Sequence, residues 1–394
     1  KTTISIIMLC FFIFGIYIYL KREHRSLRKI YYLAINFSFN KNVLYITLFI
    51  LLIILLFQNF LESLAPPTLG DDLKYHFTLP KRYLSDGSLN FYPDMLISLI
   101  PQQIEMLWLI AICLDSAELA QMINYSFPLI ILGWIYILGK QNNLREIDIL
   151  IAMILFYSIT TVSSISSSGS VELGATLFFI SGFYMLINFF NELYWHDLII
   201  SGILFGMYAS TKLPFIAMVL VLLPFIIHMA KKNKMSLFFC FKAIIIFYAL
   251  VFVFCSFWYF WAFYHTGNPF YPFLIKYFGG FELRFSGLDI NEGKSFDYAF
   301  SHLKRLPETY FLHLWHLIKD PQIHANGHIN PLFIALIPFS FIKFIRHQKG
   351  LIQILQVSFL FYIVWVSLYP QVRIALPMFA LLTIPFSGIM YYLS

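Results

Sequence analysis

Two adjacent acids stand out in a chain that carries little charge. The stretch "PPTLGDDLKYH", Pro66 to His76, places Asp71 and Asp72 directly after an apolar run long enough to cross a membrane. Its prolines and its glycine break the helix and turn the two carboxylates back toward the bilayer. A carboxylate held at that boundary can accept a proton as a general base, whereas the ordinary explanation of such a pair is a solvated loop.

Three more charged residues interrupt the ends of apolar segments. Glu172 closes "SISSSGSVE", Lys212 lies in "YASTKLP", and Arg373 lies in "YPQVRIALP". Each would cost about 2.5–3.5 kcal/mol at the centre of a bilayer, and less near its surface. The two cations could simply snorkel at helix ends. Because both are predicted on the membrane face that disfavours positive charge, we expect them to hold a bound anion.

These residue types together suit one chemistry. A lipid-linked sugar phosphate could place its phosphate against Lys212 and Arg373, while an aspartate accepts the proton of an incoming hydroxyl. The lipid tail would then lie among the apolar segments.

Composition supports a membrane protein as the frame for this site. Of the 394 residues, 60% are hydrophobic and 12% are charged, a balance that excludes an ordinary soluble domain. The net charge of +7 is spread over short loops, so it indicates topology and predicts no nucleic-acid partner. The four cysteines show no CxxC spacing, so neither a disulfide framework nor a zinc site is predicted.

The sequence predicts an all-α polytopic membrane protein with about 11 transmembrane helices in one domain over residues 1–394. The chain begins at Lys1 and ends inside an apolar segment, so we expect a piece of a longer protein. The expected spans are Thr3–Leu20, Val43–Leu61, Ala120–Leu138, Ile147–Val162, Leu173–Phe190, Leu198–Ala209, Leu213–Met229, Ala243–Phe263, Pro331–Ile342, Leu351–Leu368 and Ile374–Tyr392.

The distribution of lysine and arginine predicts which loops face the cytoplasm. Basic residues cluster in one set of loops, which the positive-inside rule places in the cytoplasm. The opposite set contains two long loops, residues 62–119 and 264–330, and the turn ending at Glu172. Within the first loop, the apolar stretch Met95–Leu114 is predicted to be an interfacial hairpin and not a span. The site is therefore expected on the extracytoplasmic face of the plasma (inner) membrane.

Two pairs of histidines and many aromatic rings complete the candidate features. His313 with His316, and His324 with His328, could form a metal site, although interfacial or substrate-contacting roles are favoured. The aromatic content of 20% is typical of belts at the membrane surface. A divalent cation is therefore neither required nor excluded by the sequence.

An ordered set of motifs resembles a known family. The segments "PPTLGDDLKYHFTLPKRYLSDG", "EMLW", "SVELG", "GMYASTKLP", "TGNPFYPF", "NPLFIALIP" and "QVRIALP" resemble the bacterial GT-C integral-membrane glycosyltransferases related to protein mannosyltransferases and lipid A aminoarabinose transferases. They cover residues 66 to 377. The resemblance implies a polyprenyl-phosphate-linked sugar donor, an inverting transfer on the outer face, and a glycan, lipid or protein acceptor.

The resemblance also implies roles for particular residues. Asp71 takes the place of the family's catalytic aspartate, with Asp72 as its rival, and Tyr75 and His76 complete the motif. The second family carboxylate falls on Glu172, where glutamate replaces the usual aspartate and Ser170 replaces an aromatic residue. Lys212 and Arg373 match cations assigned to the donor phosphate. The remaining candidates for substrate contact are Lys74, Lys81, Glu105 and Asn268.

Two other functions use the same charges. A transporter or lipid-glycan flippase would use them as a substrate path, although it would be expected to show internal repeats, which the sequence lacks. A glycan ligase or polymerase would use a pyrophosphate-linked donor and rely on loop residues such as Arg284, Arg305 and His313.

Overall fold

The computed structural model describes residues 42–114, 116–280, 308–319, 327–338, 348–368 and 370–393. Within these ranges the chain forms helices and connecting loops, with no strand. The all-helical class predicted from the sequence is therefore confirmed for this part of the chain. The predicted span Thr3–Leu20 lies outside the described residues, as do His324, Arg284 and Arg305.

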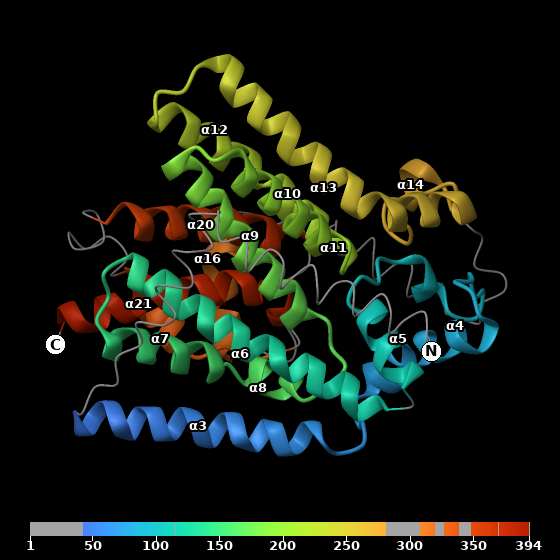
Figure 1. Ribbon diagram of the computed structural model, residues 1–394, viewed down its shortest axis with the longest axis horizontal. Coiled ribbons are helices and arrows are strands. Elements are labelled where there is room, and N and C mark those ends of the chain that lie inside the picture. Colours follow the sequence, from blue (N-terminus) through green and yellow to red (C-terminus); the bar gives the residue numbers. More distant parts are fainter. Residues whose placement is uncertain are drawn as a thin grey trace, which may run out of the picture.

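Long helices form a bundle, and shorter ones cover one of its ends (Figure 1). The helices are α3 (Val43–Ser63), η1 (Asp72–His76), α4 (Thr78–Asp86), η2 (Leu96–Leu99), α5 (Glu105–Cys113), α6 (Ala117–Gln141), α7 (Glu146–Tyr157), α8 (Thr160–Ser166), α9 (Glu172–Glu192), α10 (Trp195–Ala209), α11 (Leu213–Leu220), α12 (Leu222–Lys232), α13 (Leu237–Thr266), α14 (Ile275–Phe278), α16 (Glu308–Lys319), α18 (Leu332–Leu336), α20 (Lys349–Leu368), η6 (Val372–Ala375) and α21 (Leu376–Leu393).

Seven helical segments in the described part of the chain are long and apolar enough to cross a membrane. They are Val43–Ser63, Ala117–Gln141, Glu172–Glu192, Leu213–Lys232, Leu237–Thr266, Lys349–Leu368 and Val372–Ile389. The pair α7 and α8 makes an eighth if the two count as one span, but they bend by 72° at their junction.

Some of the predicted spans look different in the structure. The segment predicted at Leu198–Ala209 belongs to α10, whose 15 residues extend only about 22 Å and fall short of a bilayer core of about 30 Å. The described part of the segment predicted at Pro331–Ile342 forms α18, which has 5 residues. Met95–Leu114 was predicted not to span, and within it η2 and the 9-residue α5 are indeed too short to cross a bilayer.

Local sequence accounts for several of the helix ends. The side chains of Asn42, Ser116 and Ser236 accept hydrogen bonds from the first-turn backbone N–H groups of α3, α6 and α13. Gly267, with φ of 73°, ends α13 in the left-handed conformation that favours glycine. These caps set where each long helix leaves the bundle.

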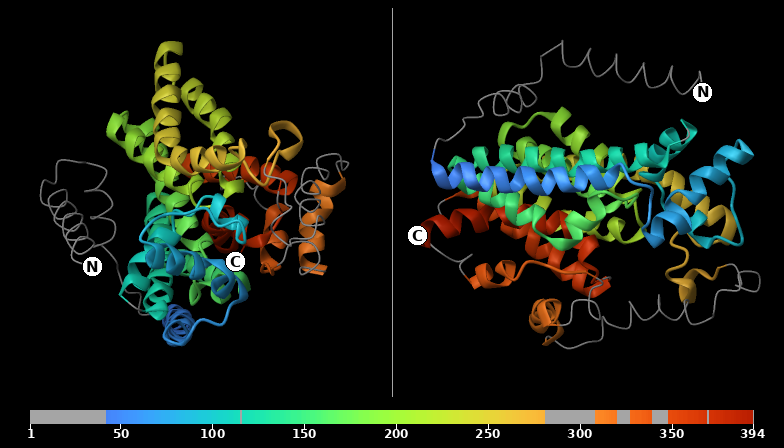
Figure 2. Two further views of the ribbon diagram at one scale, coloured as in Figure 1. Left: turned by 90° about the vertical axis from the view of Figure 1, so that its right-hand side faces the viewer. Right: turned by 90° about the horizontal axis from the view of Figure 1, so that it is seen from below.

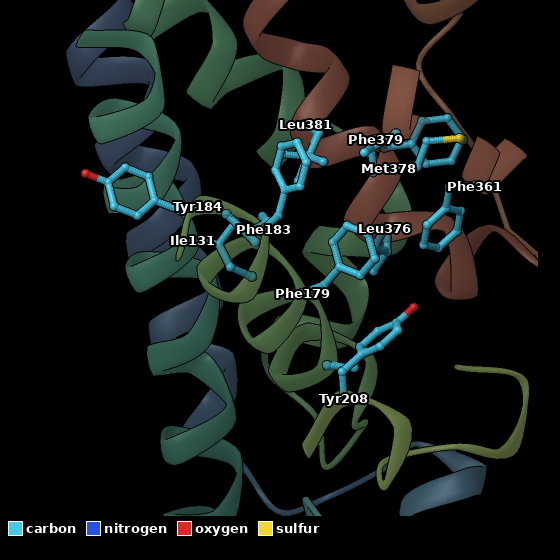
Figure 3. Close-up of a cluster of buried hydrophobic side chains, with 14 of the residues drawn as sticks. Ile131, Phe179, Phe183, Tyr184, Tyr208, Phe361, Leu376, Met378, Phe379 and Leu381 are labelled. Carbon is cyan, nitrogen blue, oxygen red and sulfur yellow. The ribbon is translucent and has the colours of Figure 1, made fainter. Parts of the chain in front are cut away.

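Helix α9 lies at the centre of the bundle. It packs against α6, α10 and α21, and its side chains meet those of α20 and α21 in the aromatic cluster of Figure 3. Phe179 is the centre of that cluster, with ring centroids 5.2 Å from Tyr208 and 5.4 Å from Phe361. The central position of α9 fixes the height of Glu172, its first residue.

Helices α3 and α13 form the outer parts of the bundle. The buried residues of α3 include Tyr45, Leu52 and Asn59, which recur every seven residues and form a single stripe. The 30 residues of α13 extend about 45 Å, and large apolar side chains such as Phe252 and Phe260 are exposed along it. Such surfaces fit contact with membrane lipids.

The two loops predicted to be external meet at one end of the bundle, where α4, α5 and α14 lie (Figures 1 and 2). The indole Nε1 of Trp261 donates to the backbone oxygen of Ser98 at 3.1 Å. The rings of Phe91 and His265 lie 5.1 Å apart. Segments far apart in the sequence therefore gather around the starts of α9, α11 and α21.

Candidate active site

Four charged side chains converge from four different elements. Asp71 directly precedes η1, and Glu172 is the first residue of α9. Lys212 precedes α11, and Arg373 lies in η6, directly before α21. Each residue stands where a helix begins or changes direction, so its side chain can reach sideways toward the others.

The four side chains form a connected ion-pair cluster. Lys212 Nζ lies 2.7 Å from Glu172 Oε1. Arg373 Nη1 lies 2.8 Å from Asp71 Oδ2, and its Nε lies 3.5 Å from Glu172 Oε1. The sequence predicted that these residues share one site, and the structure brings them together.

The four members of the cluster differ in their exposure. The Glu172 side chain has no exposed surface, while Lys212 and Arg373 are 15% and 18% exposed. Asp71 is the most accessible member, at 32%. Glu172 is thus placed to hold the two cations, and Asp71 is placed to meet a ligand.

Both cations keep hydrogen-bonding capacity beyond these ion pairs. The contact with Glu172 uses one of the three ammonium donors of Lys212. Arg373 donates through Nε to Gln371 and through Nη1 to Asp71, which uses two of the five guanidinium hydrogens. The remaining donors suit an anion that offers several oxygens, such as a phosphate.

The contact with Arg373 determines the ionisation state of Asp71. Burial alone would raise the pKa of this carboxyl, but the hydrogen bond and charge of Arg373, helped by His76 and Lys212, hold it below its ordinary value. Asp71 is therefore ionised at neutral pH, as a proton acceptor must be.

The adjacent carboxylate has a different environment. Asp72 is fully buried, and its Oδ2 accepts a 2.8 Å hydrogen bond from the backbone N–H of Gly169. Burial raises the pKa of Asp72 to about 6, although the hydrogen bond from Gly169 opposes the shift. Consecutive residues thus hold one accessible and one enclosed carboxylate.

A buried histidine–glutamate pair lies beside these acids. His76 Nδ1 is 2.9 Å from Glu105 Oε1, and both residues are less than 5% exposed. The ring of Tyr75 lies 4.2 Å from that of His76. Among the described atoms, His76 Nε2, Asp72 Oδ1 and Glu172 Oε2 are buried without a hydrogen-bond partner, so this region has polar capacity for a bound group.

The other predicted substrate residues lie apart from the cluster or are engaged elsewhere. Lys74 and Lys81 are exposed in the segment predicted to be the first external loop. The Asn268 amide is fully buried and binds the backbone oxygens of Phe273 and Gly279, so it holds its own loop in shape. These contacts explain Asn268 without a substrate.

The metal site considered for the histidine pairs is not tested, because His324 and the side chain of His316 lie outside what the structure describes. His313 is buried, with its ring 5.1 Å from that of Trp365. Among the described residues, no group of three or more histidine, cysteine, aspartate or glutamate side chains has a geometry suited to a metal ion. The pairing of His313 with His316 stays a prediction.

Sequence reasoning missed two residues that shape the site. Gly169 binds Asp72 through its N–H, and the indole of Trp108 donates to its carbonyl oxygen at 2.8 Å. The only signal in the sequence was a glycine inside a run of serines. Trp108 belongs to "EMLW", one of the segments that carry the resemblance, but nothing in the sequence indicated that it would bind Gly169.

Comparisons of the chain with protein-family models, with curated proteins and with solved structures find no match. The class of protein is therefore inferred from the structure alone. It is an all-helical protein with several helices able to cross a membrane and a charged cluster where short and long helices meet.

Proposed function

We propose that this protein is an inverting GT-C-type glycosyltransferase that takes a sugar from a polyprenyl-phosphate-linked donor. One observation supports the proposal above the others. An accessible carboxylate, Asp71, lies 2.8 Å from the guanidinium of Arg373, which also approaches Glu172, the partner of Lys212. A proton acceptor thus lies next to two cations that can bind and stabilise a departing phosphate.

The donor phosphate lies against Lys212 and Arg373 in this proposal. Glu172 keeps both cations oriented, because its Oε1 lies within 3.5 Å of each. The two acids and two cations balance in charge, so a phosphodiester adds a single negative charge to a neutral group. The polyprenyl chain lies along apolar helix surfaces, as a lipid tail requires.

The transfer proceeds in one displacement. The acceptor hydroxyl oxygen forms a bond to the anomeric carbon on the side opposite the phosphate, and the bond between that carbon and the phosphate oxygen breaks. Asp71 takes the hydroxyl proton, and the lipid leaves as polyprenyl phosphate. The acceptor is a hydroxyl-bearing glycan, lipid or protein.

The donor itself makes Asp71 a stronger base. Arg373 lowers the pKa of Asp71 through its hydrogen bond and charge. When a phosphate shares that guanidinium, its positive charge acts less strongly on Asp71, so the pKa of Asp71 rises. Proton acceptance is then favoured only when the donor is in place.

The cluster faces the extracytoplasmic side of the plasma (inner) membrane in this proposal. The support is the positive-inside rule, because the loops on the opposite side carry most of the lysines and arginines. The flippase and the pyrophosphate-dependent ligase remain the competing proposals.

Purified protein in liposomes, supplied with one labelled donor at a time, tests the function. We expect sugar to move from a polyprenyl monophosphate to an added acceptor, with inversion at the anomeric carbon and release of polyprenyl phosphate. Transfer from the pyrophosphate-linked donor alone would favour the ligase. Movement of the lipid between leaflets without any transfer would favour the flippase.

A further inference from the structure

Asp72 connects two parts of the chain that are far apart in sequence. Its Oδ2 accepts the backbone N–H of Gly169, 97 residues later, at 2.8 Å. Asp71 comes one residue before Asp72, and Glu172 comes three residues after Gly169. One hydrogen bond therefore joins the two segments that carry the carboxylates on either side of Arg373.

The segment that receives this bond is itself firmly held. The serine turn, residues 167–171, joins α8 to α9. From α6, the amide of Gln121 donates to the carbonyl oxygen of Ser167 at 2.6 Å, and the amide of Asn124 donates to that of Ser168 at 2.8 Å. An interaction with this turn thus ties η1 to the centre of the bundle.

Gly169 is held on three sides. Its N–H binds Asp72, and its carbonyl oxygen accepts from Trp108 of α5. A Cβ at this position would clash with the far end of the ring of Phe77, the buried residue that follows η1, so this ring would have to shift. Glycine at residue 169 therefore leaves room for the ring of Phe77 against the turn.

The enclosure of Asp72 argues against a direct role in proton transfer. The residue has no exposed surface, whereas the neighbouring Asp71 side chain is 32% exposed. An acceptor hydroxyl must come within hydrogen-bonding distance of its base. Asp71 meets this requirement, and Asp72 is separated from incoming groups by the residues that enclose it.

We propose that Asp72 is a positioning residue, which holds η1 against the serine turn so that Asp71 and Glu172 keep their spacing around Arg373. The adjacent acids therefore have separate roles, with Asp71 at the substrate and Asp72 behind it. This assignment rests on the proposed function. The role requires a hydrogen-bond acceptor at Asp72 and does not require a negative charge.

Replacements at residue 72 separate these requirements. Asp72→Asn keeps an amide oxygen that can accept from Gly169 but removes the charge, and Asp72→Ala removes the acceptor. Gly169→Ala keeps Asp72 and crowds the ring of Phe77, the residue that follows η1. Asp94→Asn, at an exposed acid of the same external loop, is the matched control. Transfer with a polyprenyl-phosphate donor gives kcat and KM, and thermal unfolding in detergent gives Tm.

We expect Asp72→Asn to keep at least about one third of the wild-type kcat. Asp72→Ala and Gly169→Ala should lose at least about 30-fold in kcat with donor KM within about 3-fold, because misplacing a catalytic group by an ångström slows the reaction more than binding. Asp72→Ala should lower Tm, whereas Asp72→Asn should not. A folded Asp72→Asn protein as inactive as Asp72→Ala would overturn the positioning role.

Failure of the proposed function gives a different pattern. If the wild-type protein transfers no sugar, the glycosyltransferase proposal fails, and the Tm comparison then decides whether Asp72 holds η1 to the turn. Equal Tm values for wild type, Asp72→Ala and Gly169→Ala would overturn the structural link itself.

Discussion

The guanidinium of Arg373 donates a 2.8 Å hydrogen bond to Asp71, a residue 302 positions earlier in the chain. This contact joins the start of the last described span to the segment between α3 and α4. It also sets the ionisation of Asp71, because the charge of Arg373 keeps the pKa of that carboxyl low.

Replacing Arg373 should weaken binding of the donor. Arg373→Gln removes the charge and keeps a polar side chain, and we expect donor affinity to fall at least about 10-fold, because a charge-assisted contact to phosphate contributes about 1.5–3 kcal/mol. Arg373→Lys should recover only part of the lost affinity, because lysine keeps the charge but lacks the planar guanidinium. Binding of a labelled donor to protein in detergent gives both values. Unchanged affinity in Arg373→Gln would place the phosphate elsewhere.

Lys212 and Glu172 should depend on each other. Lys212→Met leaves the fully buried Glu172 without its nearest cation, at a cost of about 3–5 kcal/mol in unfolding free energy. The double variant Lys212→Met/Glu172→Gln removes both charges and should recover most of that stability. Donor binding should stay weak in the double variant, because the phosphate has lost a cation. Thermal unfolding and donor binding measured on the same samples separate the two effects, and additive losses of stability would contradict the pairing.

The pH dependence of transfer should identify the base. Because Arg373 lowers the pKa of Asp71, kcat/KM should stay level from pH 7 to about pH 5 and decline only below about pH 4. The acid limb of kcat should lie at a higher pH than that of kcat/KM, since the bound phosphate shares Arg373. A limb of kcat/KM near pH 6 that disappears in Asp72→Asn would instead assign the proton acceptor to Asp72.

Asp72 should make the folded protein less stable as the pH rises. Burial raises its pKa from 3.8 to about 6, so the folded state favours the protonated acid. Its unfavourable ionisation is absent below about pH 4 and grows as pH rises through 6, up to a limit of about 3 kcal/mol. Asp72→Asn should therefore be more stable than wild type at pH 8, with the difference shrinking toward pH 4. Tm series across this range measure it, and a constant difference would contradict the burial of the charge.

Helix packing outside the ion-pair cluster supplies a contrasting prediction. Gly206 of α10 faces α13 so closely that a Cβ would lie 2.6 Å from Cβ of Phe254 and 3.0 Å from the backbone oxygen of Val251. Gly206→Ala should therefore lower unfolding free energy by about 1–3 kcal/mol. Tm in detergent gives the change, and donor affinity of the folded fraction should match wild type. A Tm equal to wild type would show that the helices separate easily.

The sequence predicted the members of the ion-pair cluster but not how they connect. Charges such as Lys212 and Arg373 are conspicuous at the ends of apolar segments, because burying them in a membrane is unfavourable without partners. Which acid pairs with which cation depends on the angles between helices, which hydropathy does not encode. The structure pairs Arg373 with Asp71, and Lys212 with Glu172.

Span positions were predictable where the helices are long, and less so where they break. The long apolar helices α3, α6 and α13 appear within a few residues of their expected positions, except that α13 begins six residues earlier than predicted. Buried hydrogen bonds to another helix lie at the break between α7 and α8, and hydropathy does not reveal them. For example, the buried amide of Asn59 donates to Tyr157 and Ser166 on either side of that break.

Gly169 shows why the supporting residues were hidden. Its importance comes from the closeness of Phe77 and from two backbone hydrogen bonds, neither of which depends on a distinctive side chain at residue 169. A residue whose contribution is the absence of a side chain leaves no mark on charge or hydropathy.

The most direct test of the account compares Asp71→Asn with wild type in the same liposomes. The variant is nearly the same size and keeps an oxygen for Arg373, but it cannot accept a proton at neutral pH. The account predicts a loss of at least about 100-fold in kcat, the range of general-base catalysis, with donor affinity within about 5-fold of wild type. Transfer at the wild-type rate by Asp71→Asn would contradict it.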